Sequence, residues 1–139
     1  MLDHPDSYAR TPIHTPAAPA AIGPYNQAIC HGGLLWCSGQ LGLDPATGAL
    51  VAADTAAQTK QALANLDAVC RAAGTRLHQA LRCTVFLVDM ADFATVNAIY
   101  EQHFTAPFPA RITVAVAALP RGGRIEIEAV VALICAENT

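Results

Sequence analysis

Two long apolar runs near the end of the chain each carry charged residues. The first, RITVAVAAL, begins at Arg111, and the second, RIEIEAVVALIC, contains Glu126 and Glu128. Continuous β-branched apolar stretches are typical of strands buried on both faces, so residues 111–118 and 124–135 are predicted to form two such strands. A charged side chain in a buried strand needs a partner or a function, because an uncompensated buried charge costs free energy.

Upstream of these runs, the pattern of apolar and polar positions predicts three short strands, a helix, a fourth strand and a second helix. The predicted ranges are an edge strand within 11–15, a hairpin of 27–31 and 34–38, a helix at 55–73, a central covered strand at 80–88, and a helix at 93–104. This order places two helices on one face of a mixed six-stranded sheet, an α+β architecture.

Short polar motifs predict where the two helices begin and end. Thr55 and Gln58 match a capping box, and Gly74 can adopt the left-handed conformation that ends a helix. Asp89 or Asp92 is expected to cap the second helix.

Composition indicates one domain that associates with copies of itself. The 139 residues are 53% hydrophobic and only 14% charged, against about 25% charged in an average soluble domain. We therefore expect a homo-oligomer in which the helix-free face of the sheet packs against other subunits. The net charge of −3, the single lysine and the lack of a basic cluster argue against nucleic acid as a partner.

The chain also lacks the apolar segments that a membrane protein needs. No apolar run approaches the roughly 18 residues of a membrane span, and Asp3 and Asp6 make the N-terminus unlike a signal peptide. The expected location is the cytoplasm.

Cysteine and histidine spacing gives no support to a metal or another cofactor. The five cysteines, at positions 30, 37, 70, 83 and 135, include no C-x-x-C pair and are predicted to be reduced core residues. The histidines at 4, 14, 31, 78 and 103 show no metal-binding spacing.

Candidate functional residues cluster at the charged strands. A strand period of two places Arg111 and Thr113 on one face, and Arg111 is permanently cationic and suited to bind a carboxylate. Burial would raise the pKa of Glu126, which would let it transfer protons near neutral pH. A structural ion pair remains an alternative, because Glu126 or Glu128 could pair with Arg111, Arg121 or Arg124.

Other candidates are polar residues next to apolar or glycine-rich segments. Helical spacing places Asn97 beside the aromatic positions of helix 93–104, where it could bind a ligand or a neighbouring loop. Tyr25 follows a Gly-Pro turn and either anchors that loop or faces a ligand. Ser38 and Gly39 end a strand, where glycine permits close approach to the backbone. Thr113 is otherwise an ordinary strand residue.

Five motifs in order, PAAIGPYNQA (19–28), SGQ (38–40), FATVNAIY (93–100), FPAR (108–111) and IEIEA (125–129), resemble the Rid, or YjgF, family of enamine/imine deaminases. The resemblance covers residues 16–132 and leaves 1–15 as a variable N-terminal extension of a single domain. It implies a chorismate-mutase-like fold, a homotrimer with sites between subunits, and hydrolysis of small 2-imino acids such as 2-iminopropanoate and 2-iminobutanoate.

The resemblance also assigns roles to residues. Arg111 matches the family's carboxylate-binding arginine and Glu126 its water-orienting glutamate, while substrate-lining positions match Tyr25, Ser38, Gly39 and Asn97. Many family deaminases have cysteine at the position of Thr113, so a thiol role is excluded here, although the backbone could still contact substrate.

Three other functions remain open on the sequence. A non-catalytic regulator could bind small carboxylates through Arg111 alone. A deaminase of a larger enamine, such as an aminomuconate, would keep the same fold and arginine. Ribonuclease or translation-inhibitor activity, with which family members have been labelled, is disfavoured by the acidic charge balance.

Overall fold

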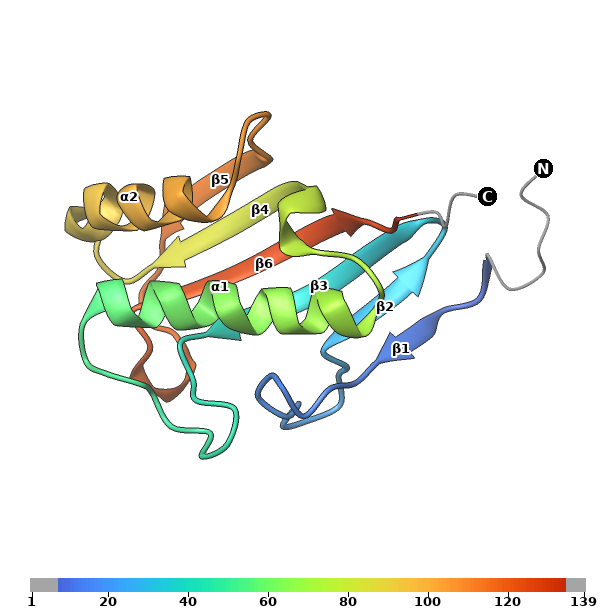
Figure 1. The fold of residues 1–139 in the computed structure, drawn as a ribbon. Helices are drawn as coiled ribbons and strands as arrows, with labels where there is room; N and C mark the ends of the chain where they lie inside the picture. The colour runs from blue at the N-terminus through green and yellow to red at the C-terminus, as the bar shows by residue number, and fades with distance from the viewer. Residues whose placement is uncertain (1–7, 135–139) are drawn as a thin grey trace.

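Two helices lie on one face of a single sheet in the computed structural model, which describes residues 8–134 (Figure 1). The strands are β1 (Thr11–Ile13), β2 (Ala28–His31), β3 (Leu34–Leu41), β4 (Ala80–Leu87), β5 (Ala110–Ala115) and β6 (Ile125–Ala132), and the helices are α1 (Thr55–Ala72) and α2 (Phe93–His103). Residues 1–7 of the predicted extension, including His4, and Cys135 at the end of the predicted last strand lie outside the described residues.

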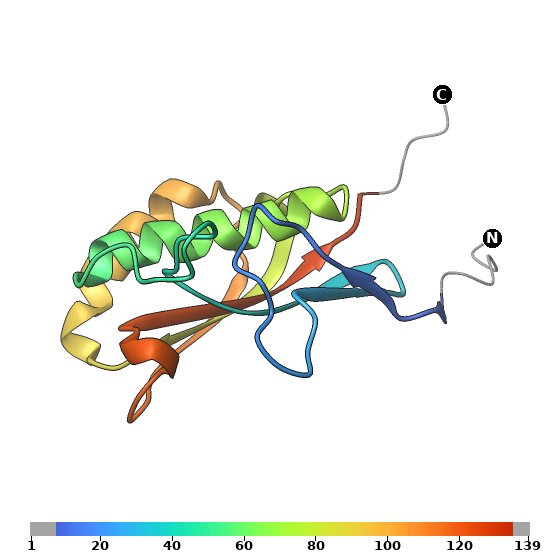
Figure 2. The same ribbon diagram turned by 90° about the horizontal axis from the view of Figure 1, so that it is seen from below.

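The strands are arranged in the order β1-β2-β3-β6-β4-β5. All neighbours are antiparallel except β4 and β5, which are parallel. The predicted mixed six-stranded α+β architecture is therefore confirmed. Figure 2 shows α1 and α2 on one face of the sheet, and among residues 8–134 no α-helix covers the other face.

Strand period and burial agree on which side chains face the helices. Along β6, alternate residues are fully buried and the residues between them are half-buried. The buried set is Ile125, Ile127, Ala129 and Val131, which join Leu63, Leu66 and Val69 of α1 in the core. Glu126 and Glu128 consequently point to the helix-free face.

The prediction that residues 111–118 are buried on both faces is wrong for the single chain. Within residues 8–134, β5 is an edge strand whose one neighbour is β4. Ile112 and Val114 are 50% and 39% exposed on the helix-free face. β4 is central, as predicted, but it is not covered throughout, because Leu81 near its start is half exposed. An apolar run thus predicts the strands correctly without saying whether the chain itself covers them.

The start of α1 differs from the predicted capping box. Asp54 is the N-cap, and its carboxylate accepts a hydrogen bond from the Ala57 backbone N–H. Thr55 instead donates its hydroxyl proton to Asp92 at 2.6 Å, and Gln58 binds the Ala52 carbonyl and the Arg124 N–H. These tertiary bonds satisfy the side chains that the local motif assigned to capping.

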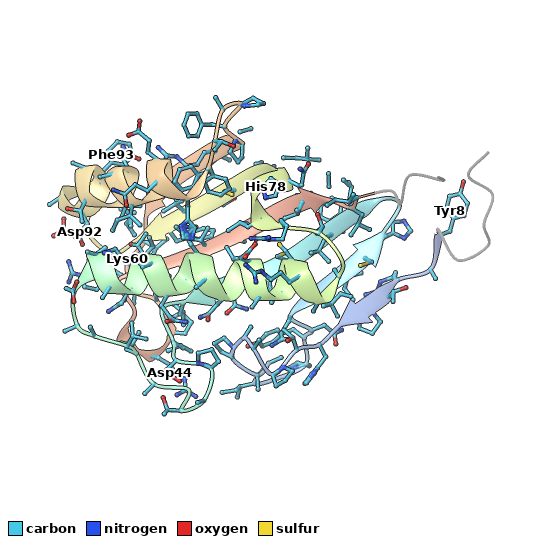
Figure 3. The ribbon with its side chains drawn as sticks, viewed as in Figure 1. Tyr8, Asp44, Lys60, His78, Asp92 and Phe93 are labelled. Carbon is cyan, nitrogen blue, oxygen red and sulfur yellow. The ribbon has the colours of Figure 1, made fainter. Side chains whose placement is uncertain are left out.

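Asp92 precedes α2 at the end nearest the start of α1 (Figure 3). It occupies the N-cap position but makes no capping bond, since its carboxylate pairs with Arg124 at 2.8 Å. The Thr55 hydroxyl and then Arg124 lower the pKa of Asp92. Asp89 caps only the preceding short 3-10 turn. As predicted, Gly74 follows α1 with a positive φ of 81°.

The cysteines within the described chain are reduced, as predicted. Cys37, Cys70 and Cys83 are buried core residues, while Cys30 is half-buried. A hydrogen bond with Cys70, together with burial, raises the pKa of Cys37 and keeps it a thiol. Among residues 8–134, no group of three or more His, Cys, Asp or Glu side chains could hold a metal ion. None of the described helices combines the length and apolar character needed to cross a membrane.

Candidate active site

Arg111 lies on the helix side of β5, against the aromatic face of α2. Its guanidinium carbon is 4.8 Å from the centroid of the Tyr100 ring and 5.7 Å from that of Phe93. The register pairs Arg111 with Cys83 and Thr113 with Val85, so both share the helix-facing side, as predicted. Stacking on aromatic rings fixes a guanidinium while leaving its N–H groups available at the edge.

The guanidinium faces a shallow hollow, the arginine hollow, of about 360 Å³. Its lining residues are Asn97, Tyr100, Glu101, Phe108, Pro109 and Arg111. Among the described residues Arg111 has no salt-bridge partner. The cation is therefore not neutralised by a carboxylate of the described chain.

Three buried polar atoms on the helix side of the sheet near Arg111 have no hydrogen-bond partner among the described residues. They are Oδ1 of Asn97, the hydroxyl of Tyr100 and Oγ1 of Thr113. Burial and the neighbouring Cys83 thiol raise the pKa of Tyr100, so it stays protonated. Because Oγ1 of Thr113 is shielded and Thr113 does not line the arginine hollow, its hydroxyl is poorly placed for a ligand. The alternative to ligand binding was a hydrogen bond between Asn97 and a neighbouring loop. Oδ1 of Asn97 makes no such bond among residues 8–134.

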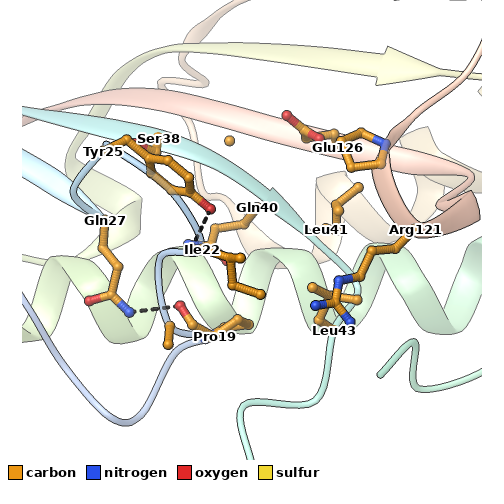
Figure 4. Close-up of a pocket in the computed structure, with 13 residues that line it drawn as sticks. Pro19, Ile22, Tyr25, Gln27, Ser38, Gln40, Leu41, Leu43, Arg121 and Glu126 are labelled. Atoms are coloured by element: carbon orange, nitrogen blue, oxygen red, sulfur yellow. Dashed lines mark hydrogen bonds between the residues drawn. The ribbon is translucent and has the colours of Figure 1, made fainter. Parts of the chain in front are cut away.

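Glu126 lies in a different and larger cavity, the glutamate pocket, of about 570 Å³ (Figure 4). The pocket is lined by residues 19–27, the end of β3 and the loop before β6: Pro19, Ala20, Ile22, Tyr25, Gln27, Ser38, Gly39, Gln40, Leu41, Leu43, Pro120, Arg121 and Glu126. Burial, and then the nearby charge of Glu128, raise the pKa of Glu126. Neither acid forms a salt bridge within residues 8–134, and Arg124 pairs with Asp92 instead.

A bulge in β3 makes room for the Glu126 carboxylate. The β3–β6 register shifts between Cys37 and Gln40, with Gly39 inside the shift. A Cβ atom on Gly39 would overlap Oε1 of Glu126 and lie 2.9 Å from its Cδ. The absence of a side chain at position 39 is what allows the carboxylate to lie against the strand.

Residues 19–27 line one side of the glutamate pocket, and the buried amide of Gln27 holds this segment in place. The side chain donates to the carbonyls of Thr15, Ala18 and Pro19 and accepts from the Thr15 N–H at 2.7 Å. Tyr25 is half exposed, and its hydroxyl accepts a bond from the Ile22 N–H, as Figure 4 shows.

Ser38 uses its hydroxyl within the chain, since it donates to the Asn26 carbonyl at 2.6 Å. It thus ties the loop that carries Tyr25 to the end of β3.

The candidate residues therefore form two groups on opposite faces of one sheet. Arg111, Thr113 and Asn97 lie on the helix side, whereas Glu126 shares the other face with Phe86, its partner on β4. The structure brings Glu126 together with Tyr25, Ser38 and Gly39 in one pocket. It does not bring Arg111 into that pocket.

Three residues near the site were not among the functional candidates predicted from the sequence. Gln27 orders the pocket wall and Tyr100 supports Arg111, and both lie inside motifs that were recognised. Arg121 lines the glutamate pocket from the LPRGG turn. In the sequence, the one sign of a role for Arg121 is a single cation between a proline and a glycine. The same pattern also fits an ordinary surface turn.

Comparison with known proteins gives a consistent result. A family model described as Endoribonuclease L-PSP matches residues 15–133. A 2-iminobutanoate/2-iminopropanoate deaminase of Bos taurus is 50% identical over 124 residues, which span 89% of this chain and 90% of that protein.

Two solved structures also resemble the chain. A Rid-family protein of unknown function from Yersinia pestis is 45% identical and superposes with a TM-score of 0.87, covering 90% of this chain and all of that one. TdcF of E. coli, solved with bound serine, is 39% identical with a TM-score of 0.84, covering 88% and 98% of the two chains.

Proposed function

This chain belongs to the Rid, or YjgF, family, and on that premise we propose that it is a hydrolytic deaminase of small 2-imino acids. Substrates of the 2-iminopropanoate and 2-iminobutanoate type would yield a 2-oxo acid and ammonia. The observation that carries the proposal concerns two charged residues that each line a cavity. Among residues 8–134, Arg111 has no carboxylate partner and the desolvated Glu126 has no basic one. The naming of the half-identical bovine relative supports the same activity.

We propose that the complete site forms between subunits of a homotrimer. In one chain Arg111 and Glu126 project from opposite faces of the sheet, so one subunit's arginine hollow would meet its neighbour's glutamate pocket. The exposed apolar side chains of Trp36, Ile112 and Val114 on the helix-free face support such packing. The count of three rests on the family resemblance, and a cytoplasmic location likewise stays a prediction from the sequence.

Substrate binding would depend mainly on Arg111. A 2-imino acid has a carboxylate next to its C=N bond, and a bidentate guanidinium fixes both its position and its plane. Hydrogen bonds to charged groups contribute about 1.5–3 kcal/mol each. The bound serine named for TdcF is a small carboxylate of this kind. Asn97, at the rim of the same hollow, would orient the imine nitrogen or the attacking water.

Glu126 would act as general base and then as general acid. It removes a proton from water as the oxygen adds to the imine carbon, and the C=N electron pair moves to nitrogen. Glu126 then returns the proton to that nitrogen, which gives a carbinolamine. In a second transfer Glu126 takes the proton of the added hydroxyl and passes it to the amino group, so that the C–N bond breaks, ammonia leaves and the carbonyl forms. The raised pKa of Glu126 makes its carboxylate a stronger base for the first transfer, and such catalysis typically contributes about 10²–10⁴-fold.

The remaining candidates would shape the site. Tyr25 has a hydroxyl proton free to bind water or the amino group, because the Ile22 N–H uses only its oxygen. Ser38 would hold the Tyr25 loop, and Gly39 would admit the Glu126 carboxylate. Thr113 would contact substrate only through its backbone, since its hydroxyl is shielded.

The test is to generate 2-iminopropanoate in situ with an amino-acid oxidase and to trap the surviving imine with semicarbazide. Added protein should suppress the trapped product, and Arg111→Ala should abolish that suppression. An unchanged yield with wild-type protein would refute the deaminase proposal.

The family description as an endoribonuclease gains no support from the surface charge of this chain. Nucleic-acid binding depends on neutralising phosphates with basic side chains, whereas this chain has eight Lys and Arg against eleven Asp and Glu. A filter-binding assay with RNA at low salt should therefore detect no complex.

A further inference from the structure

Arg121 has a backbone conformation that is unusual for a residue with a Cβ atom. Its φ of 58° and ψ of 19° lie in the left-handed region, and it is the one non-glycine residue with positive φ among residues 8–134. The next residue, Gly122, also has a positive φ, of 70°. Strained positions of this kind concentrate at binding and catalytic sites.

The guanidinium of Arg121 is held at the edge of the glutamate pocket. It donates one bond to the Gly48 carbonyl at 2.9 Å and has no salt-bridge partner among the described residues. An arginine side chain carries five N–H donors, so several remain for a ligand. The contact with Gly48 fixes the cation in place without neutralising its charge.

Charges of opposite sign thus line the same cavity at separate places. In the close-up view Leu41 lies between Glu126 and the guanidinium of Arg121 (Figure 4). The wall around them is apolar, with Ile22, Leu43 and Pro120 among its residues. A substrate whose reacting carbon lies at Glu126 could extend its side chain past Leu41, and an anionic end would then meet Arg121.

We propose that Arg121 forms a distal subsite for a second anionic group, so that imino acids with a carboxylate at the end of the side chain are favoured substrates. The proposal rests on the proposed deaminase function, because it assigns the far end of the same pocket. Imines of this class arise when an acidic amino acid is oxidised at its α-carbon. The enzyme supplying the substrate would therefore be an oxidase or dehydrogenase of acidic amino acids.

The test compares two imines of equal length, 2-iminoglutarate and 2-iminopentanoate, each generated in situ and followed by loss of semicarbazide trapping. Wild-type protein should have the higher kcat/KM for 2-iminoglutarate. Arg121→Gln should reduce the ratio of the two kcat/KM values about tenfold or more, because it removes a charged hydrogen-bond donor, and should leave 2-iminopentanoate turnover intact. Arg121→Gly should do the same while relieving the backbone strain, which guards against a folding defect.

The matched control is Arg71→Gln, which removes an exposed arginine of α1 that pairs with Asp67 and should leave the ratio unchanged. The subsite proposal is overturned if Arg121→Gln and Arg121→Gly keep the wild-type ratio. It is also overturned if wild-type protein hydrolyses 2-iminopropanoate but not 2-iminoglutarate, a result that would leave the deaminase function standing. If wild-type protein hydrolysed none of the imines tested, the deaminase function itself would be refuted.

Discussion

The carboxylate of Glu126 lies against the backbone of Gly39, at the place where a Cβ atom would otherwise stand. The bulge between Cys37 and Gln40 creates this space, and it directs the acid into the glutamate pocket. The position of the Glu126 carboxylate on β6 thus depends on the absence of a side chain at Gly39 on β3. Gly39 therefore fixes the geometry of the proposed catalytic acid although it contributes no reactive atom.

Gly39→Ala should reduce kcat at least tenfold, since the new methyl group displaces the Glu126 carboxylate and misaligned groups lose rate steeply. The fold should survive, because the atoms that must move belong to the end of a flexible side chain. Imine hydrolysis and thermal unfolding measure the two effects. The double variant Gly39→Ala/Glu126→Gln is the control: it should be no slower than Glu126→Gln alone, and additive losses would show that Gly39 acts elsewhere.

Glu126→Gln distinguishes an enzyme from a non-catalytic carboxylate sensor. The variant keeps the shape of the side chain but cannot accept a proton from water, so kcat should fall about 10²–10⁴-fold. Binding of a stable 2-oxo acid, measured by calorimetry, should persist because Arg111 is unchanged. Full turnover in Glu126→Gln would remove the acid from the mechanism and favour the sensor.

The pH dependence of activity should follow Glu126. Since the base must be deprotonated, kcat/KM should fall as pH drops through its raised pKa. Glu128→Gln removes a neighbouring negative charge, which lowers the pKa of Glu126, so the acid limb of the profile should move to lower pH. Asp44→Asn, which changes net charge equally on a turn, serves as control. An acid limb that stays in place or moves upward in Glu128→Gln would contradict the assignment.

Thr113→Val should leave imine hydrolysis within about twofold of wild type and raise the free energy of unfolding by up to about 1 kcal/mol. The reason is that Oγ1 of Thr113 is buried without a partner among the described residues, and replacing an unsatisfied buried polar group by an apolar one of similar shape is neutral or favourable. Denaturant unfolding and steady-state kinetics check both parts. A tenfold loss of kcat/KM would mean that the hydroxyl does contact substrate.

Much of the fold could be predicted because hydrophobic period identifies helices and strands directly. The exposure of β5 could not be predicted. The apolar run that begins at Arg111 has the same pattern whether this chain or another subunit covers the strand. The cap of α1 was misplaced by one residue because Asp54 and Thr55 are both good capping residues. Only the tertiary partners Asp92 and Arg124, which bind the Thr55 hydroxyl, decide between them.

The candidate site was predictable in its residue types but not in its arrangement. Charges inside apolar strands pointed to Arg111 and Glu126, as physical chemistry requires. That they face opposite sides depends on the register of β4 with both β5 and β6, which no local pattern encodes. Arg121 was considered only as an ion-pair partner, because the role proposed for it depends on a backbone angle and a cavity, and neither is visible in the sequence.

Complementation between inactive subunits tests most directly whether the site is shared. Arg111→Ala and Glu126→Gln chains are each prepared as inactive assemblies, then mixed in equal amounts, unfolded and refolded together. If each site takes its arginine and its glutamate from different subunits, random assembly should restore about a quarter of wild-type imine hydrolysis. Arg111→Ala mixed with the double variant Arg111→Ala/Glu126→Gln should stay inactive, and an equally inactive mixture of the two single variants would contradict the shared site.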